Sequence, residues 1–148
     1  MGEWKAHKKV EGKMEFKEIV NEEDIRLLMQ EYVGFHDSCI KEIKYVSGSY
    51  VNENRSMQPF NDVRRVEVLF QSQIAKKRDL ELHFVKLKSM YLEPQDENYD
   101  GIIYEASLKQ FEGLFYWCDW ESFKKEDIDV TKGTWISSEK IMWRFREK

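Results

Sequence analysis

The stretch Gly34-Phe35-His36-Asp37-Ser38 divides the chain into a helical part and a part in which strand patterns predominate. On its N-terminal side, apolar residues recur at the spacing of a single helix face, namely Ile25, Leu28, Met29 and Tyr32. Asn21 is a favourable N-cap, because its side chain can accept hydrogen bonds from the free amides of the first turn. Gly34 suits the end of a helix, where a left-handed residue is common. We therefore expect one helix over roughly residues 22–33.

On the C-terminal side of this stretch, apolar and polar residues alternate with the period of half-buried strands. Two such runs follow one another, the first with Val66, Val68 and Phe70 and the second with Leu80, Leu82 and Phe84. A polar segment containing Lys76-Lys77-Arg78 separates them, which predicts an antiparallel hairpin. Later strands are expected over residues 102–111, 114–120 and 135–145.

The segment between residues 38 and 62 allows two interpretations. Residues 38–51 form either one bent strand with a bulge or a tight hairpin that turns at Ser47-Gly48-Ser49. Residues 52–62 contain Pro59 and three asparagines, which predicts a loop.

The order of these elements predicts the fold class. One N-terminal helix precedes about six strands, with turn signals between them, which favours a mainly-β fold: an antiparallel β-sandwich or a barrel-like sheet packed by the helix. Aromatic residues make up 14% of the chain, and bulky rings suit a pleated surface. The 148 residues fit a single domain, 1–148, with residues 1–13 as a loose lead-in.

The composition indicates where in the cell the protein is expected and which classes of partner are not expected. Charged residues make up 35% of the chain, yet the net charge is only −4, so no general attraction to nucleic acid or to membranes is expected. The N-terminus lacks the pattern of a signal peptide, and no apolar run approaches the ~20 residues that span a bilayer. We therefore expect a cytoplasmic protein in which Cys39 and Cys118 are reduced.

The charges are unevenly distributed along the chain. Residues 55–92 carry eight Lys and Arg against four Asp and Glu, a net +4, whereas residues 93–129 carry eleven acids against three lysines, a net −8. These charges are either the separate solvated ends of strands and loops or one acidic face that binds a basic protein partner.

His36, Asp37 and Ser38 are the first candidate site, because they bring together a base, a carboxylate and a hydroxyl. Adjacent residues cannot form a catalytic triad alone, since neighbours in a strand point to opposite faces. The alternative is structural: Asp37 or Ser38 bonds backbone groups at the junction between helix and sheet, with His36 packed there.

The aromatic run Phe115-Tyr116-Trp117-Cys118-Asp119-Trp120 is the second candidate. Such a run is either sheet core or a flat platform for a ligand, in which Trp117 and Trp120 supply the rings and Asp119 the polar anchor. Cys118 has no basic neighbour in the sequence and is expected to be a small buried hydrophobe.

No metal or cofactor is expected. The chain has no Cys-x-x-Cys, no His-x-x-x-His and no calcium-loop pattern, and its seven glycines form no phosphate-binding loop. The acidic residues near Asp96, Glu97 and Asp100 are interpreted as an ordinary polar turn.

The Phe35-His36-Asp37-Ser38 motif, the successive strand pairs and the Trp143-Arg144 ending resemble a group of small uncharacterised bacterial proteins of Firmicutes type. More distantly, they resemble an all-β predicted immunity-protein family of polymorphic toxin systems, with the likeness covering residues 35–146. The resemblance implies a cytosolic bacterial binding domain that neutralises a toxin. The main hypothesis is therefore a non-enzymatic protein-interaction domain. The alternative is a small-ligand-binding or hydrolytic β-domain that uses His36 and Asp37 with a platform at Trp117 and Trp120.

Overall fold

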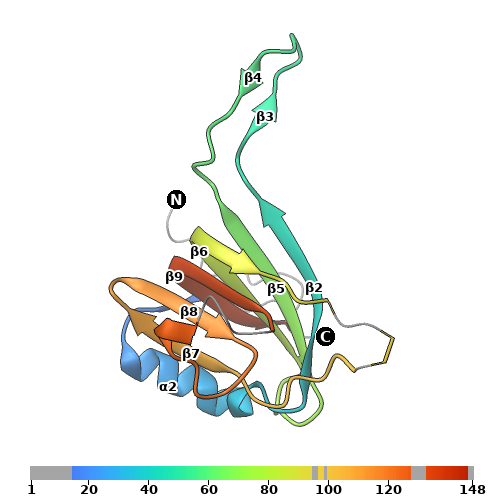
Figure 1. Ribbon diagram of the computed structural model, residues 1–148, viewed down its shortest axis with the longest axis vertical. Helices are drawn as coiled ribbons and strands as arrows, with labels where there is room; N and C mark the ends of the chain where they lie inside the picture. Colours follow the sequence, from blue (N-terminus) through green and yellow to red (C-terminus); the bar gives the residue numbers. More distant parts are fainter. Residues whose placement is uncertain (1–14, 95–96, 99, 128–132, 147–148) are drawn as a thin grey trace.

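A computed structural model describes residues 15–94, 97–98, 100–127 and 133–146, and shows one antiparallel sheet of seven strands with a helix packed against it (Figure 1). The strand order is β2-β5-β6-β9-β8-β7, and β1 pairs with the free part of β9 beside β8. The strands are β1 (Lys17–Ile19), β2 (Ser38–Val46), β5 (Arg65–Ser72), β6 (Asp79–Tyr91), β7 (Ser107–Phe111), β8 (Leu114–Cys118) and β9 (Trp135–Arg146). The expectation of a mainly-β fold with one N-terminal helix is confirmed.

The helix, α2 (Glu22–Glu31), begins where the sequence predicts. Asn21 Oδ1 accepts a hydrogen bond from the Asp24 amide at 3.0 Å, and the Asp24 carboxylate accepts one from the Asn21 amide, which makes a capping box. The helix gives way to a short 3₁₀ turn, η1 (Val33–Phe35), in which Gly34 has a φ of 62°. Ile25 and Leu28 are buried against the sheet. No helix in the described part of the chain has the length and apolar character needed to cross a membrane.

The predicted central hairpin is formed by β5 and β6. Val68 pairs with Leu82, so the apolar residues of both strands share one face, and all six of them are fully buried: Val66, Val68, Phe70, Leu80, Leu82 and Phe84. Their polar neighbours lie on the opposite face, which we call the outer face of the sheet. This alternation is the pattern that the sequence displays.

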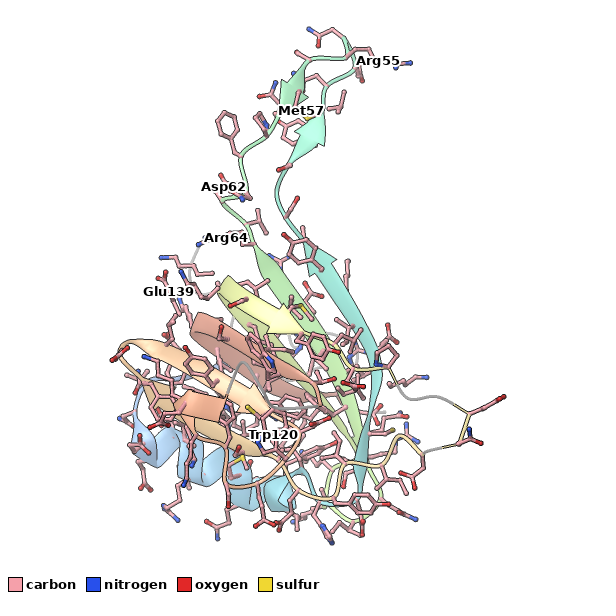
Figure 2. The ribbon with its side chains drawn as sticks, viewed as in Figure 1. Arg55, Met57, Asp62, Arg64, Trp120 and Glu139 are labelled. Atoms are coloured by element: carbon pink, nitrogen blue, oxygen red, sulfur yellow. The ribbon has the colours of Figure 1, made fainter. Side chains whose placement is uncertain are left out.

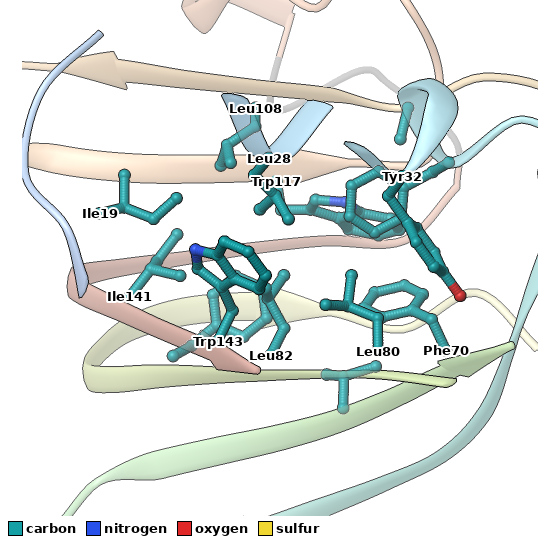
Figure 3. Close-up of a cluster of buried hydrophobic side chains, with 14 of the residues drawn as sticks. Ile19, Leu28, Tyr32, Phe70, Leu80, Leu82, Leu108, Trp117, Ile141 and Trp143 are labelled. Atoms are coloured by element: carbon teal, nitrogen blue, oxygen red, sulfur yellow. The ribbon is translucent and has the colours of Figure 1, made fainter. Parts of the chain in front are cut away.

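The sheet is strongly curved around its core (Figure 3). Phe70 on β5 and Trp117 on β8 are separated by two strands, a span of roughly 14 Å along a flat sheet. Their ring centroids nevertheless lie 5.2 Å apart, so the sheet must curl to bring them together. An isolated bridge between Ser38 and Ile103 also joins the start of β2 to the segment before β7. The molecule is therefore a barrel-like single sheet, and α2 packs beside β7 (Figure 1).

The segment between β2 and β5 excludes the tight hairpin at Ser47-Gly48-Ser49 and comes close to the bent strand, which is interrupted at these three residues. The chain continues past Gly48 into β3 (Tyr50–Val51), turns, and returns through β4 (Met57–Gln58), so residues 47–64 form a projecting two-stranded arm (Figure 1). Ser47 is a pairing position rather than a turn, since its carbonyl accepts a hydrogen bond from the Arg64 amide at 3.0 Å. The loop predicted for residues 52–62 is wrong in part, because Met57 and Gln58 pair with Val51 and Tyr50, so the chain turns only between these two short strands.

The expected strand over residues 102–111 is also too long at its start. Only Ser107–Phe111 pairs as β7, whereas the preceding residues run alongside the junction between helix and sheet. The lead-in expected over residues 1–13 lies outside the described residues.

Candidate functional site

Asp37 and Ser38 anchor the backbone where the helix gives way to the sheet. The Ser38 hydroxyl donates to the Phe35 carbonyl at 2.6 Å, and Ser38 is buried. The Asp37 amide donates to the Ile103 carbonyl at 2.9 Å, and the Ile103 amide donates to the Ser38 carbonyl at 2.7 Å. The Asp37 carbonyl in turn accepts from the Gln73 amide at 3.0 Å. These bonds tie the segment around Ile103 to the junction.

His36 lies at the surface of the same junction. Its Nδ1 is 2.5 Å from the Tyr104 carbonyl oxygen, and its Nε2 is 3.6 Å from Asp37 Oδ2. The hydrogen bond with the Tyr104 carbonyl raises the pKa of His36, and the negative charges of Asp37 and Glu105 act in the same direction. Because the Ser38 hydroxyl is engaged with a carbonyl, the three neighbouring side chains do not form a nucleophile–base relay.

The backbone of the junction is strained. Val33, Phe35 and Asp37 have φ values of 54°, 63° and 59°, in the left-handed region that residues other than glycine rarely adopt. Such conformations persist only where the surrounding structure holds them. Here the hydrogen bonds to Ile103 and the buried ring of Phe35 do so.

A shallow pocket of about 240 Å³ lies beside the junction and is open to solvent. It is smaller than the cavities of about 300–1,000 Å³ that hold typical small ligands. The residues lining it are Asp37, Ser38, Cys39, Gln71, Ser72, Gln73 and Ile102. His36, Trp117 and Trp120 are not among them, so the pocket does not unite the residues of the small-ligand hypothesis.

The two tryptophans of the aromatic run lie on opposite faces of the sheet. Trp117 is fully buried, with its ring centroid 5.7 Å from that of Phe35, and presents no face to a ligand. Trp120 packs in a separate cluster, with its ring 5.5 Å from that of Phe123. Asp119 is tied by its amide to the Thr134 carbonyl, and burial raises the pKa of its carboxyl. These residues form core packing rather than a shared platform.

Both cysteines are free, and they differ in access. Cys118 is fully buried, and burial raises the pKa of its thiol, an effect to which the Asp119 charge adds. Cys39 is partly exposed and lines the pocket. The interpretation of Cys118 as a small buried hydrophobe is confirmed.

Two carboxylates, Asp37 and Glu105, act on His36, and two more extend this group, since Asp100 bonds Tyr104 and Glu121 bonds Glu105. We call these four carboxylates the acidic edge: Asp37, Asp100, Glu105 and Glu121. A hydrogen bond with the Glu105 carboxyl raises the pKa of Glu121, and repulsion between the two negative charges raises it further. Both side chains are exposed, and the pairing of like charges is electrostatically unfavourable.

Two apolar side chains lie within the acidic edge. Ile102 is 43% exposed and Tyr104 is 61% exposed, and the Tyr104 hydroxyl donates to Asp100 Oδ2 at 3.2 Å. The Ala106 amide donates to the Gly34 carbonyl at 3.1 Å, so this segment is fixed to the junction at both of its ends.

The other acids of residues 93–129 do not all belong to this edge. Glu112 pairs with Lys125, and Asp119 is partly buried behind β8. Asp96 and Asp129 lie outside the described residues. The acidic segment therefore supplies a small cluster rather than one continuous face among the residues that are described.

A second polar cluster lies on the outer face of the sheet, and the sequence does not reveal it. Glu81 is 5% exposed, and its Oε1 accepts from Arg144 Nε at 2.8 Å and from Arg146 Nε at 3.3 Å. Its Oε2 lies 3.0 Å from His83 Nε2, and Glu67 Oε1 lies 3.9 Å from the same nitrogen. The residues come from β5, β6 and β9, and only the strand register brings them together.

Glu67, Glu81 and His83 have the donor atoms of a metal site, since one ligand atom of each lies within 4.8 Å of the others. Arginines already neutralise both carboxylates, however: Arg65 Nε donates to Glu67 Oε2 at 2.8 Å, and Arg144 donates to Glu81. A divalent cation would add two positive charges beside these guanidinium groups, so the arrangement suits an ion-pair network better than a metal centre.

Phe16 covers this network. Its ring centroid lies 4.5 Å from that of His83, and the Arg144 guanidinium lies 4.0 Å from the Phe16 ring. The aromatic cover accounts in part for the low exposure of the charged groups beneath it.

Comparisons of the chain with protein-family models, with curated proteins and with solved structures found no match.

Proposed function

We propose that this protein is a non-enzymatic, cytoplasmic interaction domain that binds a basic region of a partner protein through the acidic edge, as an immunity-type protein binds a toxin. The observation that carries the proposal is the exposed pair of Glu105 and Glu121: a hydrogen bond between the two carboxyls raises the pKa of Glu121, and repulsion between their negative charges raises it further. A Lys or Arg side chain of a partner placed between the two carboxylates would relieve this repulsion. Binding would then gain energy that the free protein lacks.

The apolar groups in the acidic edge support the same proposal. Protein interfaces commonly combine an aromatic or apolar centre with a charged rim, and Tyr is frequent among the side chains that contribute most to binding. Tyr104 and Ile102 are the exposed apolar groups here, with carboxylates beside them. The hydrogen bonds from Ile103 and Ala106 to the junction hold this segment in place before a partner arrives, which lowers the entropic cost of binding.

The Ser38 hydroxyl and the Cys118 thiol give little support for catalysis. The Ser38 hydroxyl donates to a backbone carbonyl, and the Cys118 thiol is buried with a raised pKa. Neither group is therefore activated as a nucleophile. The binding role rests on exposed groups, which a partner can reach without any rearrangement of the core.

The test is a comparison of two charge-matched double variants. Tagged wild-type protein is used to isolate a partner from cells of the producing organism, and the purified partner is then measured against Glu105→Gln/Glu121→Gln and against the control Glu22→Gln/Glu139→Gln. All four positions are exposed, and both variants remove two negative charges. We expect the association rate constant to fall several-fold for the first variant only, with a weaker dependence on salt, because rim charges act mainly on association.

Equal association rates and equal salt dependence for the two variants would contradict the acidic-edge proposal. A separate growth assay tests whether the protein neutralises a toxin. A neighbouring gene for a toxic protein is expressed with and without this chain. Growth should be restored by the wild type and by the control variant, and less well by Glu105→Gln/Glu121→Gln.

A further inference from the structure

The projecting arm, residues 47–64, is a second exposed surface with a different chemistry (Figure 2). Four of its large apolar side chains are mostly exposed, namely Tyr50 at 59%, Val51 at 50%, Met57 at 61% and Phe60 at 62%. An isolated two-stranded hairpin is only marginally stable in water, and grouped exposed apolar side chains usually mark a binding surface.

The apolar side chains occupy both faces of the arm. Val51 pairs with Met57 and Tyr50 pairs with Gln58, so each pair shares a face and the two pairs lie on opposite faces. Val51 and Met57 therefore form an apolar patch on one face, and the Tyr50 ring lies on the other. A partner that covered a single face would leave the opposite apolar group in water.

The arm carries no net charge. Its two acids, Glu53 and Asp62, balance its two bases, Arg55 and Arg64. In the acidic edge, by contrast, carboxylates predominate. The arm therefore favours an apolar contact surface over an electrostatic one.

The two segments at the base of the arm are packed closely together. Gly48 has a φ of 101°, and a Cβ there would lie 2.9 Å from Asp62 Oδ1. The Ser49 hydroxyl also donates to the Phe60 carbonyl at 3.0 Å, which joins the outgoing and returning segments of the arm. These contacts fix the direction in which the arm leaves the sheet, so it is presented to a partner largely preformed.

We propose that the arm inserts into an apolar cleft of a partner protein, with Val51 and Met57 against one wall and Tyr50 against the other. A standard interface uses about 20–30 residues on each side. The arm has 18 residues, so it approaches that size only if both faces are buried. Two copies of this chain laid arm against arm would bury one face of each, which makes a cleft in another protein the better match.

This inference is independent of the proposed function. β2 runs from the junction at Ser38 towards the arm, and its nine residues span about 30 Å. The arm and the acidic edge therefore lie towards opposite ends of the molecule (Figure 1). Either surface can bind a partner if the other does not.

The test is photo-crosslinking from both faces. A benzoylphenylalanine replaces Tyr50 in one full-length variant, Met57 in a second, and Glu139, an exposed residue on the body, in a control. In cells of the producing organism, we expect both arm positions to crosslink to the same protein and the Glu139 position not to do so. The inference is overturned if only one face crosslinks, if neither does, or if the product has twice the mass of this chain.

Affinity measurements with the purified crosslinked partner complete the test. Tyr50→Ser and Met57→Ser should each weaken binding at least tenfold, mainly through faster dissociation and without a change in salt dependence, because they remove buried apolar area. Gln30→Ser, at an exposed position of α2 outside the arm, is the control and should have little effect. A loss of affinity that depends on salt, or one shared by Gln30→Ser, would contradict apolar insertion. Failure here leaves the association-rate test of the acidic edge unaffected.

Discussion

Replacing Glu81 by Gln should destabilise the fold substantially, because it removes the central charge of the outer-face network. The side chain keeps its shape and one acceptor oxygen, but it loses the negative charge that faces three donors. These are Arg144 Nε at 2.8 Å, His83 Nε2 at 3.0 Å and Arg146 Nε at 3.3 Å. The two arginines and the histidine then remain close together without their shared counter-charge.

The expected loss follows from the two shorter contacts. Hydrogen bonds to charged groups contribute about 1.5–3 kcal/mol each, and removing one partner of a buried ion pair costs about 3–5 kcal/mol. Arg146 makes the longest bond and its side chain is 37% exposed, so it adds little. We expect a loss of about 3 kcal/mol in the free energy of unfolding, which for a chain of this size lowers the melting temperature by about 6–12 °C.

The effect should depend on pH in a defined direction. Burial raises the pKa of Glu81, but hydrogen bonds from His83, Arg144 and Arg146 outweigh it and hold the pKa well below its usual range. A carboxyl with a lowered pKa in the folded state stabilises the protein above its unfolded pKa of about 4.3, and this contribution is lost as the pH falls towards the folded pKa. The difference in the free energy of unfolding between wild type and Glu81→Gln should therefore have its largest value at pH 7 and should decrease below about pH 4.

Urea unfolding followed by tryptophan fluorescence, at pH 7 and at steps down to pH 3, measures this difference. Glu139→Gln is the control, because it removes the same charge from an exposed position on β9. If Glu81→Gln unfolds within about 0.5 kcal/mol of the wild type at pH 7, as surface substitutions typically do, the network contributes no net stability and the reasoning fails. A difference that stays constant with pH would refute the role assigned to the charge.

Three further predictions concern the thiols, the arm and the junction. An alkylating reagent should modify Cys39 in the native protein but reach Cys118 only on unfolding, since Cys118 is fully buried; mass spectrometry that finds both thiols modified at the same rate would contradict this. Gly48→Ala should speed amide hydrogen exchange across residues 49–63 while the sheet core stays protected, because a Cβ at this position would lie 2.9 Å from Asp62 Oδ1. The pKa of His36 measured by NMR should lie above that in the unfolded chain. The stabilisation from His36 is therefore present below the unfolded pKa and is lost as the pH rises through the folded pKa. A pKa at or below that of the unfolded chain would exclude the bond to the Tyr104 carbonyl.

The sequence predicts α2 and the central hairpin because their signals are local. The capping box uses residues three apart, Asn21 and Asp24, and the helix stripe lies within a dozen residues. The alternation of Val66, Val68 and Phe70 likewise needs only neighbouring positions to display a buried face. The position of His36 between helix and sheet follows from the same local patterns, and a junction is where the structure places it.

The arm and the outer-face network could not be predicted in this way. β3 pairs with β4 across a segment rich in turn residues, and the turn signals alone predicted a loop. Glu81 and Arg144 lie 63 positions apart, and they meet only because β6 pairs with β9 in that register. A shift of one strand by one residue would place the two side chains on opposite faces of the sheet.

By itself, then, the sequence determined the helix, the two-residue alternation of the strands and the mainly-β class, since each depends on the spacing of neighbouring residues. Only the tertiary structure decided which charged groups meet. The curvature of the sheet buried Trp117 between Phe35 and Phe70, which turned an expected platform into core. The pairing of strands far apart in the chain set the outer-face network, because side-chain contacts across a sheet depend on register, which local patterns leave undetermined.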